Sequence, residues 1–370
     1  MATVAVRRSF VDTSSFVFLV FLGLAGYGLF LILPIVLERM AAHPGPGLFA
    51  ALVWALYGGI LLVILYRMEL FERRSTVTIA GAFVWGAVVV TGIGTKATPA
   101  MAGIASSWLG PEQADWVPAI AAPLVEEPLK LLGVLALAMI PGARINSALD
   151  GLFFGMIVGL GFEVVESYLY TVDAVAAQGG GYAAVFSMLL LRGVISGLWT
   201  HPTFSGISGA GVGYYFGSPR PRLRRLVVAS GCLLLAIVLH GLFNSPLLAA
   251  SPVIGAIVKG LPTLVVLLVI LRMARNDERS RFDHAAVLAI DRALLGDGER
   301  QTLLHRSTRR RAVEGMRASS GDAAALALRE LQDAQIEMVE EAIYDGVGSA
   351  GFQSASNRVR TAKASLSDLT

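Results

Sequence analysis

The chain has 370 residues, of which 55% are hydrophobic and 15% charged, and its mean hydropathy is +0.66. This composition excludes a soluble globular protein and indicates a protein that crosses a membrane several times. The net charge of +3 gives no indication of nucleic-acid binding, and the single cysteine, Cys232, excludes both a disulfide framework and a cysteine-based zinc site.

Apolar runs of about 20 residues predict membrane-spanning helices. In chain order the runs are 14–37, 47–67, 77–97, 116–140, 147–171, 193–217, 226–247 and 252–272. Clusters of arginine fall on one side of the membrane only if the long apolar stretch 182–217 crosses once, with Pro202 distorting its helix and Arg192 near the outer surface. The sequence therefore predicts an all-α polytopic protein with eight spans, both termini in the cytoplasm, and Arg192 as an interfacial anchor.

The composition changes after Met273. Residues 1–273 are expected to form the transmembrane domain, whose candidate functional residues lie within 116–247. Residues 274–370 are charged and rich in alanine, and their periodicity predicts a cytoplasmic helical tail that is partly disordered.

Several ionisable residues fall inside the apolar runs, where each charge costs about 2.5–3.5 kcal/mol. They include Glu126, Glu127 and Lys130 on the fourth run, Glu163 and Glu166 on the fifth, His201 on the sixth and His240 on the seventh. Counted from the helix ends, the paired glutamates, Glu166 and the two histidines reach a similar depth in the outer half of the bilayer. This common depth predicts that they face one another in a shared site. No role follows for Glu163.

Residues four apart on a helix share a face. Such pairs are Glu126 with Lys130, Phe162 with Glu166, and His240 with Asn244. Lys130 is expected to hold a glutamate ionised, and Asn244 to fix one ring nitrogen of His240. Gly151, Gly155 and Gly159 form a stripe of small residues that predicts close helix packing.

Glutamates and histidines that face one another in a site of low polarity suit the activation of water. A glutamate can take a proton from water as it attacks an amide carbonyl, while a histidine donates to the oxyanion or to the leaving nitrogen. The same groups can instead bind a divalent metal ion. The residues alone leave both mechanisms open, although the absence of an HExxH sequence argues against a site-2 type metalloprotease.

Four short motifs resemble those of one known family. "EEPLK" at 126–130, "FEVVE" at 162–166, "HPTFSG" from His201 and "HGLFN" from His240 are similar to the motifs of the PrsW family of intramembrane proteases. That family is related to the CAAX-processing and bacteriocin-processing membrane proteases. The resemblance implies a multi-pass protein of the bacterial plasma membrane that cleaves membrane-associated proteins, the named example being site-1 cleavage of an anti-sigma factor.

The resemblance also implies which residues form the site. Matched position by position, the catalytic residues are Glu126, Glu127, Glu166, His201 and His240. Glu127 is favoured slightly over Glu126 as the base that activates water. If a metal such as zinc is present, its expected ligands are Glu166, His201 and His240.

Two other functions are compatible with parts of the sequence. A proton-coupled transporter also places Glu, Lys and His inside the membrane, but the two halves of this chain show no convincing inverted repeat. A rhomboid-type serine protease is suggested by "GISG" around Ser208 with His240 on a later span. A rhomboid-type mechanism, however, would leave the paired glutamates without a role.

Overall fold

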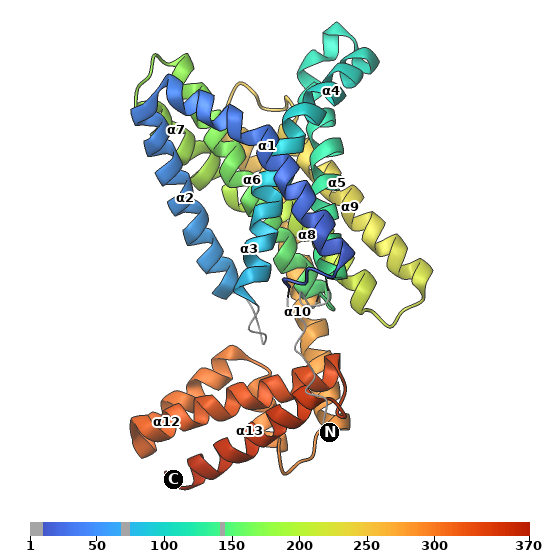
Figure 1. The fold of residues 1–370 in the computed structure, drawn as a ribbon, viewed down its shortest axis with the longest axis vertical. Coiled ribbons are helices and arrows are strands. Elements are labelled where there is room, and N and C mark those ends of the chain that lie inside the picture. The colour runs from blue at the N-terminus through green and yellow to red at the C-terminus, as the bar shows by residue number, and fades with distance from the viewer. Residues whose placement is uncertain (1–9, 68–74, 141–144) are drawn as a thin grey trace. The chain divides into compact units, whose positions relative to one another are not determined.

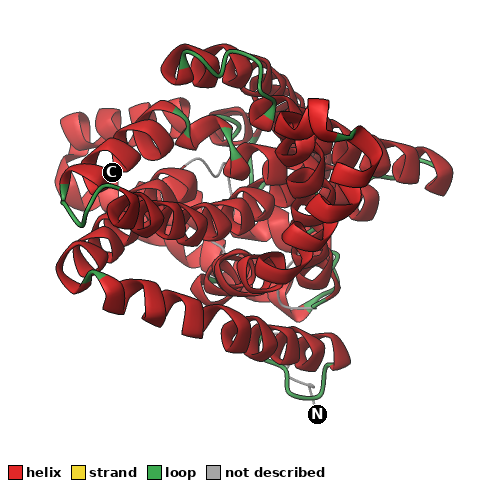
Figure 2. Cartoon of the chain, turned by 90° about the horizontal axis from the view of Figure 1, so that it is seen from above, coloured by secondary structure: helices red, strands yellow, loops and turns green. Residues whose placement is uncertain are grey.

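The computed structural model describes residues 10–67, 75–140 and 145–370, and every regular element within these ranges is a helix (Figure 2). The chain divides into two compact units, the first ending at Ala274 and the second formed by residues 275–370. The helices of the first unit are α1 (Phe16–Ala42), α2 (Pro44–Arg67), α3 (Thr76–Val84), α4 (Thr91–Leu109), α5 (Val117–Met139), α6 (Ala148–Ala177), α7 (Ala183–Met188), α8 (His201–Gly217), α9 (Arg222–Asn244) and the first part of α10 (Pro252–Ala289).

Six helical stretches in the described residues are long and apolar enough to cross a membrane. They are α1, α2, the continuous stretch Thr76–Leu109 that contains α3 and α4, α6, α9, and Pro252–Leu288 within α10. Large apolar side chains such as Phe30 and Leu56 are exposed on them, as expected for contact with lipid. The fourth and sixth predicted spans correspond to helices α5 and α8, but α5 carries three charged residues and α8 has only 17 residues. Eight spans therefore stay a prediction, and six are supported.

Helix α6 is the innermost helix of the first unit (Figure 1), and 89% of its most apolar window is buried. Its middle turns, residues 152–161, are apolar on all sides, which is typical of a helix that is surrounded by other helices. Helices α2, α3 and α8 pack against it, and α9 packs on the other side of α8. This arrangement places Glu166 of α6 beside His201 of α8, whose ring lies 5.0 Å from that of His240 on α9.

The glycine stripe of α6 packs directly on the backbone of α8. A Cβ atom at Gly155 would lie 2.1 Å from the carbonyl oxygen of Ser205, and one at Gly159 would lie 2.2 Å from that of His201. Any side chain at these positions would push the two helices apart. The predicted close packing is confirmed, and it fixes the position of His201 relative to α6.

The chain before α8 differs from the predicted span over 193–217, whose helix was expected to be distorted at Pro202. A π-helical turn (Leu189–Ile195) and a 3₁₀ turn (Gly197–Trp199) precede Thr200, and α8 begins only at His201. Pro202 lies in the first turn of α8, where a backbone N–H would have no partner within the helix. Pro202 therefore starts the helix and does not distort its middle.

The second unit is helical as well. It contains the end of α10, α11 (Asp297–Leu303), α12 (Arg306–Tyr344) and α13 (Ala350–Ser367), and α12 is interrupted at Gly321, whose φ is +87°. These helices enclose a hydrophobic core of their own, which includes Phe282, Met338 and Val359. The location of this unit in the cytoplasm and the disorder of part of it stay predictions.

Candidate active site

The paired glutamates and the lysine of α5 are buried. Lys130 Nζ donates to Glu127 Oε1 at 2.8 Å and to Glu126 Oε2 at 3.4 Å. Both contacts follow from the spacing of three and four residues along one helix. Lys130 Nζ also lies 3.0 Å from His201 Nδ1 and 4.0 Å from the centre of the Phe162 ring. The three N–H groups of this ammonium thus meet three acceptors, and its charge is compensated by two carboxylates.

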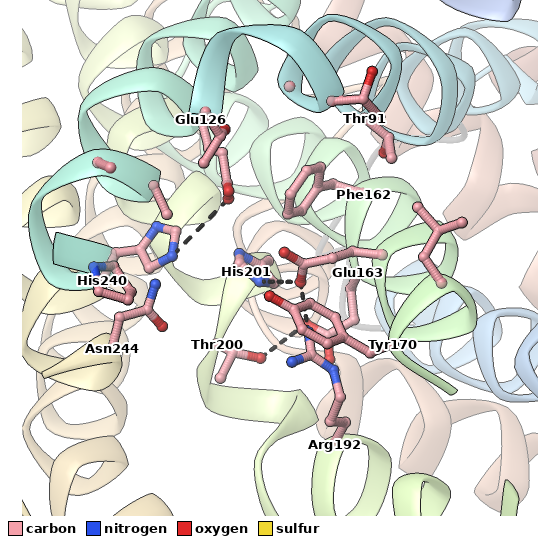
Figure 3. Close-up of a pocket in the computed structure, with 18 of the residues that line it drawn as sticks. Thr91, Glu126, Phe162, Glu163, Tyr170, Arg192, Thr200, His201, His240 and Asn244 are labelled. Atoms are coloured by element: carbon pink, nitrogen blue, oxygen red, sulfur yellow. Dashed lines mark hydrogen bonds and ion pairs between the residues drawn. The ribbon is translucent and has the colours of Figure 1, made fainter. Parts of the chain in front are cut away.

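Glu127, not Asn244, orients His240. The Nδ1 atom of His240 lies 2.9 Å from Glu127 Oε1, and its ring is stacked on Phe204. This contact leaves Nε2 facing Glu126, whose Oε2 is 4.0 Å away (Figure 3). Within the described part of the chain no hydrogen bond joins Asn244 to His240, although Asn244 lines the same cavity. The role predicted for Asn244 is taken by a carboxylate because Glu127 projects from α5 directly onto α9.

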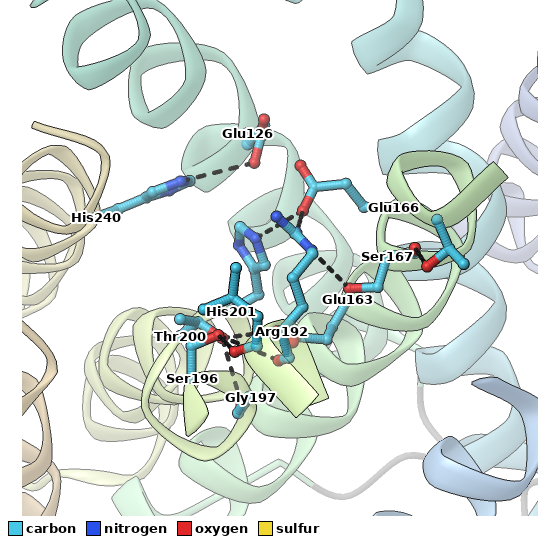
Figure 4. A network of polar contacts seen from close by, with 12 residues as sticks. Glu126, Glu163, Glu166, Ser167, Arg192, Ser196, Gly197, Thr200, His201 and His240 are labelled. Carbon is cyan, nitrogen blue, oxygen red and sulfur yellow. Dashed lines mark hydrogen bonds and ion pairs between the residues drawn. The ribbon is translucent and has the colours of Figure 1, made fainter. Parts of the chain in front are cut away.

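His201 stands at the first position of α8 and connects both groups of acids. Its Nδ1 atom faces Lys130, and its Nε2 atom lies 3.0 Å from Glu166 Oε2 (Figure 4). The ring is 5.0 Å from that of His240, centre to centre, and its other side meets the Phe162 ring at 4.7 Å. Phe162, which shares a face of α6 with Glu166, thus forms an apolar wall of the site.

Arg192 belongs to the site, and the prediction of an interfacial anchor missed this. Its Nη2 atom lies 2.5 Å from Glu166 Oε2, its Nε atom donates to Ser167 Oγ at 3.0 Å, and its guanidinium lies over the Tyr170 ring. The signal in the sequence was a lone arginine in an apolar stretch, which is costly in lipid unless it is paired. The π-helical turn that carries Arg192 directs the side chain onto α6.

Glu163, whose role could not be predicted from the sequence, anchors the start of α8. The residue is 1% exposed, and its Oε2 atom accepts a hydrogen bond from Thr200 Oγ1 at 2.8 Å. Thr200 immediately precedes His201. The buried acid therefore ties the chain next to His201 to α6.

A cavity of about 600 Å³ runs between α4, α5, α6, α8 and α9. Glu126, Glu166, His201 and His240 line it, as do Arg192 and Glu163. Glu127 and Lys130 are fully buried behind this lining and are not part of it. The cavity thus gives the two adjacent glutamates different surroundings: Glu126 can meet a substrate, and Glu127 contacts Lys130 and His240.

Three residues could hold a metal ion. Each of Glu126, His201 and His240 offers one potential ligand atom, and these three atoms lie within 4.8 Å of one another. One carboxylate oxygen and two imidazole nitrogens are a donor set used by catalytic zinc ions, and the contact of His240 Nδ1 with Glu127 is the kind of support such ligands have. His201 has partners at both ring nitrogens and would exchange one of them for the metal.

This set differs from the predicted ligands in one residue, since Glu126 stands in it in place of Glu166. The Oε2 atom of Glu166 is engaged by both Arg192 and His201. Arg192 and His201 lie on other elements than Glu166, so the spacing of residues along α6 does not predict these contacts. The donor set as such still fits a divalent metal.

The fold and the site together define a multi-pass membrane protein with a buried, enzyme-like group of acids and imidazoles. Residues 74–274, more than half of the chain, match the family model of the PrsW family intramembrane metalloproteases. The chain therefore belongs to this family and is a peptide hydrolase of membranes, as the motifs predicted. Comparison with curated proteins and with solved structures gives no match.

Proposed function

We propose that this protein is an endopeptidase that cuts membrane-protein substrates at the cavity between α5, α6, α8 and α9. The observation that carries the proposal is the convergence of Glu126, His201 and His240 in one buried cavity of an intramembrane metalloprotease. Glu126, His201 and His240 would hold a divalent metal such as zinc, which would polarise the scissile carbonyl and acidify a bound water.

Glu166 is the proposed general base. It lines the cavity, it lies beside His201, and its contact with Arg192 holds its carboxylate in position. In this scheme Glu166 takes a proton from the water whose oxygen attacks the carbonyl carbon of the peptide. The C–N bond then breaks as the leaving nitrogen takes that proton from Glu166. In a metal-free variant of the scheme Glu126 is the base, and the free Nε2 of His240 faces the reacting group.

Glu127, which the sequence favoured as the base, is proposed as a positioning residue. It does not line the cavity, and its Oε1 atom is shared by Lys130 and His240. Its carboxylate therefore fixes the orientation of the His240 ring. The five predicted catalytic residues thus divide into four that reach the cavity and one that supports them.

The expected substrates are membrane proteins, and an anti-sigma factor of a bacterial plasma membrane is proposed from the resemblance of the motifs. The orientation with both termini in the cytoplasm, which places the site in the outer half of the bilayer, is part of the same proposal. The arginines at positions 67, 144 and 272 support this orientation, because Arg67, Arg144 and Arg272 would then lie on the cytoplasmic side.

The serine-protease alternative has no support from the geometry. Ser208 is buried in α8, its Oγ atom donates to the carbonyl oxygen of Ser205, and it does not line the cavity. A nucleophilic serine needs an adjacent base, and no hydrogen bond joins Ser208 to His240 in the described residues.

The test is cleavage of a single-span substrate by purified protein in detergent. Glu166→Gln should lower kcat at least about 100-fold, because a positioned general base contributes that much or more. His240→Ala should lose activity to a similar degree, and Ser208→Ala should cut like wild type. A chain in which only Ser208→Ala is inactive would instead be a serine protease. If nothing is cut and liposomes take up protons in a glutamate-dependent way, the protein is a transporter.

A further inference from the structure

The cavity has two chemically different parts. The charged part contains Glu166, Arg192 and the two histidines. The other part is formed by α4 and by the first turns of α5, and the only charged lining residue that these two helices contribute is Glu126. We call the group of Thr91, Gly94, Thr98, Ala121 and Ala122 the Gly94 pocket.

Gly94 is small for a reason other than helix packing. It is buried, yet a Cβ atom built on it would meet nothing closer than Thr98 Oγ1 at 3.9 Å. Two residues earlier, a Cβ atom at Gly92 would lie 2.3 Å from the carbonyl oxygen of Gly28, so that glycine is required by packing. A glycine weakens the interior of a helix. What Gly94 borders is the cavity, and its lack of a side chain leaves that space open.

The surface of this pocket offers little to a charged group. The hydroxyl of Thr91 donates to the carbonyl oxygen of Gly86 at 3.1 Å, and that of Thr95 donates to Gly92 at 2.6 Å. The protons of these two hydroxyls are therefore used within their own helix. The other two residues of the pocket are alanines, and Phe162 lines the same cavity. An apolar group would enter at the least cost, because these residues carry no charge and two of the three threonine hydroxyls beside Gly94 are already used within the helix.

The pocket is close to the reacting groups. Ala122 and Glu126 are four residues apart on α5, so they share a face and are separated by about one helical turn of 5.4 Å. An extended peptide advances about 3.4 Å per residue. A side chain in the Gly94 pocket thus belongs to a residue within about two positions of a peptide bond held at Glu126.

We propose that the Gly94 pocket is a specificity subsite that receives a large apolar side chain of the substrate beside the scissile bond. Gly94 keeps the pocket deep enough for leucine or phenylalanine. This inference rests on the proposed peptidase function and adds the class of substrate side chain that the site selects.

For the test, the scissile bond of a single-span substrate is first mapped by mass spectrometry. Three versions of this substrate are then compared, which differ only in having alanine, leucine or phenylalanine at the positions that flank this bond. Gly94→Leu should lower kcat/KM for the leucine and phenylalanine substrates at least about 10-fold and change that for the alanine substrate less than about 2-fold. Gly103→Leu is the matched control, because Gly103 is an exposed glycine of the same helix with nothing within 4 Å of its Cβ position. It should cut all three substrates like wild type.

An equal loss on all three substrates, or no loss on any, would overturn the subsite. If Gly94→Leu does not give a folded, monodisperse protein, Gly94→Ala decides. Gly94→Ala should lower kcat/KM for the phenylalanine substrate selectively, and an unchanged ratio between the phenylalanine and alanine substrates would overturn the subsite. If wild type cuts none of the set, the proposed peptidase function fails and the subsite fails with it, a result that does not depend on residue 94.

Discussion

Two adjacent glutamates on one helix have different surroundings in this protein. Consecutive residues of an α-helix point about 100° apart, so Glu126 and Glu127 cannot share a face. Glu126 lines the cavity, and Glu127 is 0% exposed and contacts Lys130 and His240. The pair could be identified from the sequence because two acids inside an apolar run are costly. Which of the two reaches the cavity depends on where α9 packs, and the spacing along α5 does not contain that information.

The supporting role of Glu127 can be measured. Glu127→Ala should lower activity about 10- to 100-fold, as is typical for residues that orient a metal-binding or catalytic histidine. Glu127→Gln keeps an oxygen that can accept from His240, so it should recover a large part of the loss. The measurement is kcat and KM for one substrate with both variants, and the main effect should be on kcat. Two variants that are equally inactive would instead place Glu127 in the chemical step.

The polar contacts of the site show the same limit of sequence reasoning. Glu163 bonds to Thr200, and Arg192 bonds to Glu166, although 37 and 26 residues separate them. Neither pair follows from helical periodicity, since the partners come from different elements. Glu163 and Glu166 could be recognised from the sequence as charges inside an apolar run, whereas Arg192 was predicted at the membrane surface, and only the fold shows what these residues contact.

At the scale of elements, the close contact of α6 with α8 holds the acids and His201 together. The stripe of glycines could be read from the sequence because its four-residue spacing places the small residues on one face. The partner helix could not be read, since many helices here contain small residues. The irregular chain from Leu189 to Trp199 was also missed, because an apolar run has the same composition whether it forms an α-helix or a π-helical turn.

Gly155→Ala should destabilise the protein. Its Cβ atom would lie 2.1 Å from the backbone oxygen of Ser205, and overpacking of this kind costs about 1–3 kcal/mol. The midpoint of thermal unfolding in detergent should therefore fall. Gly231→Ala is the control, since Gly231 is a glycine of α9 with nothing within 4 Å of its Cβ position, and its midpoint should not fall. If Gly155→Ala unfolds at the same temperature as wild type, the close contact of α6 and α8 does not exist.

At the scale of the whole molecule, composition was sufficient to establish a helical, multi-pass membrane protein. The number of spans was harder to derive, because the helix that carries Glu126, Glu127 and Lys130 is too charged to count by hydropathy. This difficulty has a functional cause: α5 faces a polar cavity, so part of it does not need to be apolar. The second unit follows from the change of composition after Met273, while its hydrophobic core around Met338 is a result of the fold.

We propose above that the cavity lined by Glu126, His201 and His240 is where peptide bonds of membrane proteins are hydrolysed. The most direct measurement is mass spectrometry of a single-span substrate placed in liposomes together with the purified protein. Wild type should yield two fragments whose masses place the cut within the span or at its extracytoplasmic end, and Glu126→Gln should yield none. If Glu126→Gln gives the same fragments at the same rate, the cavity lined by Glu126 is not the site of peptide hydrolysis.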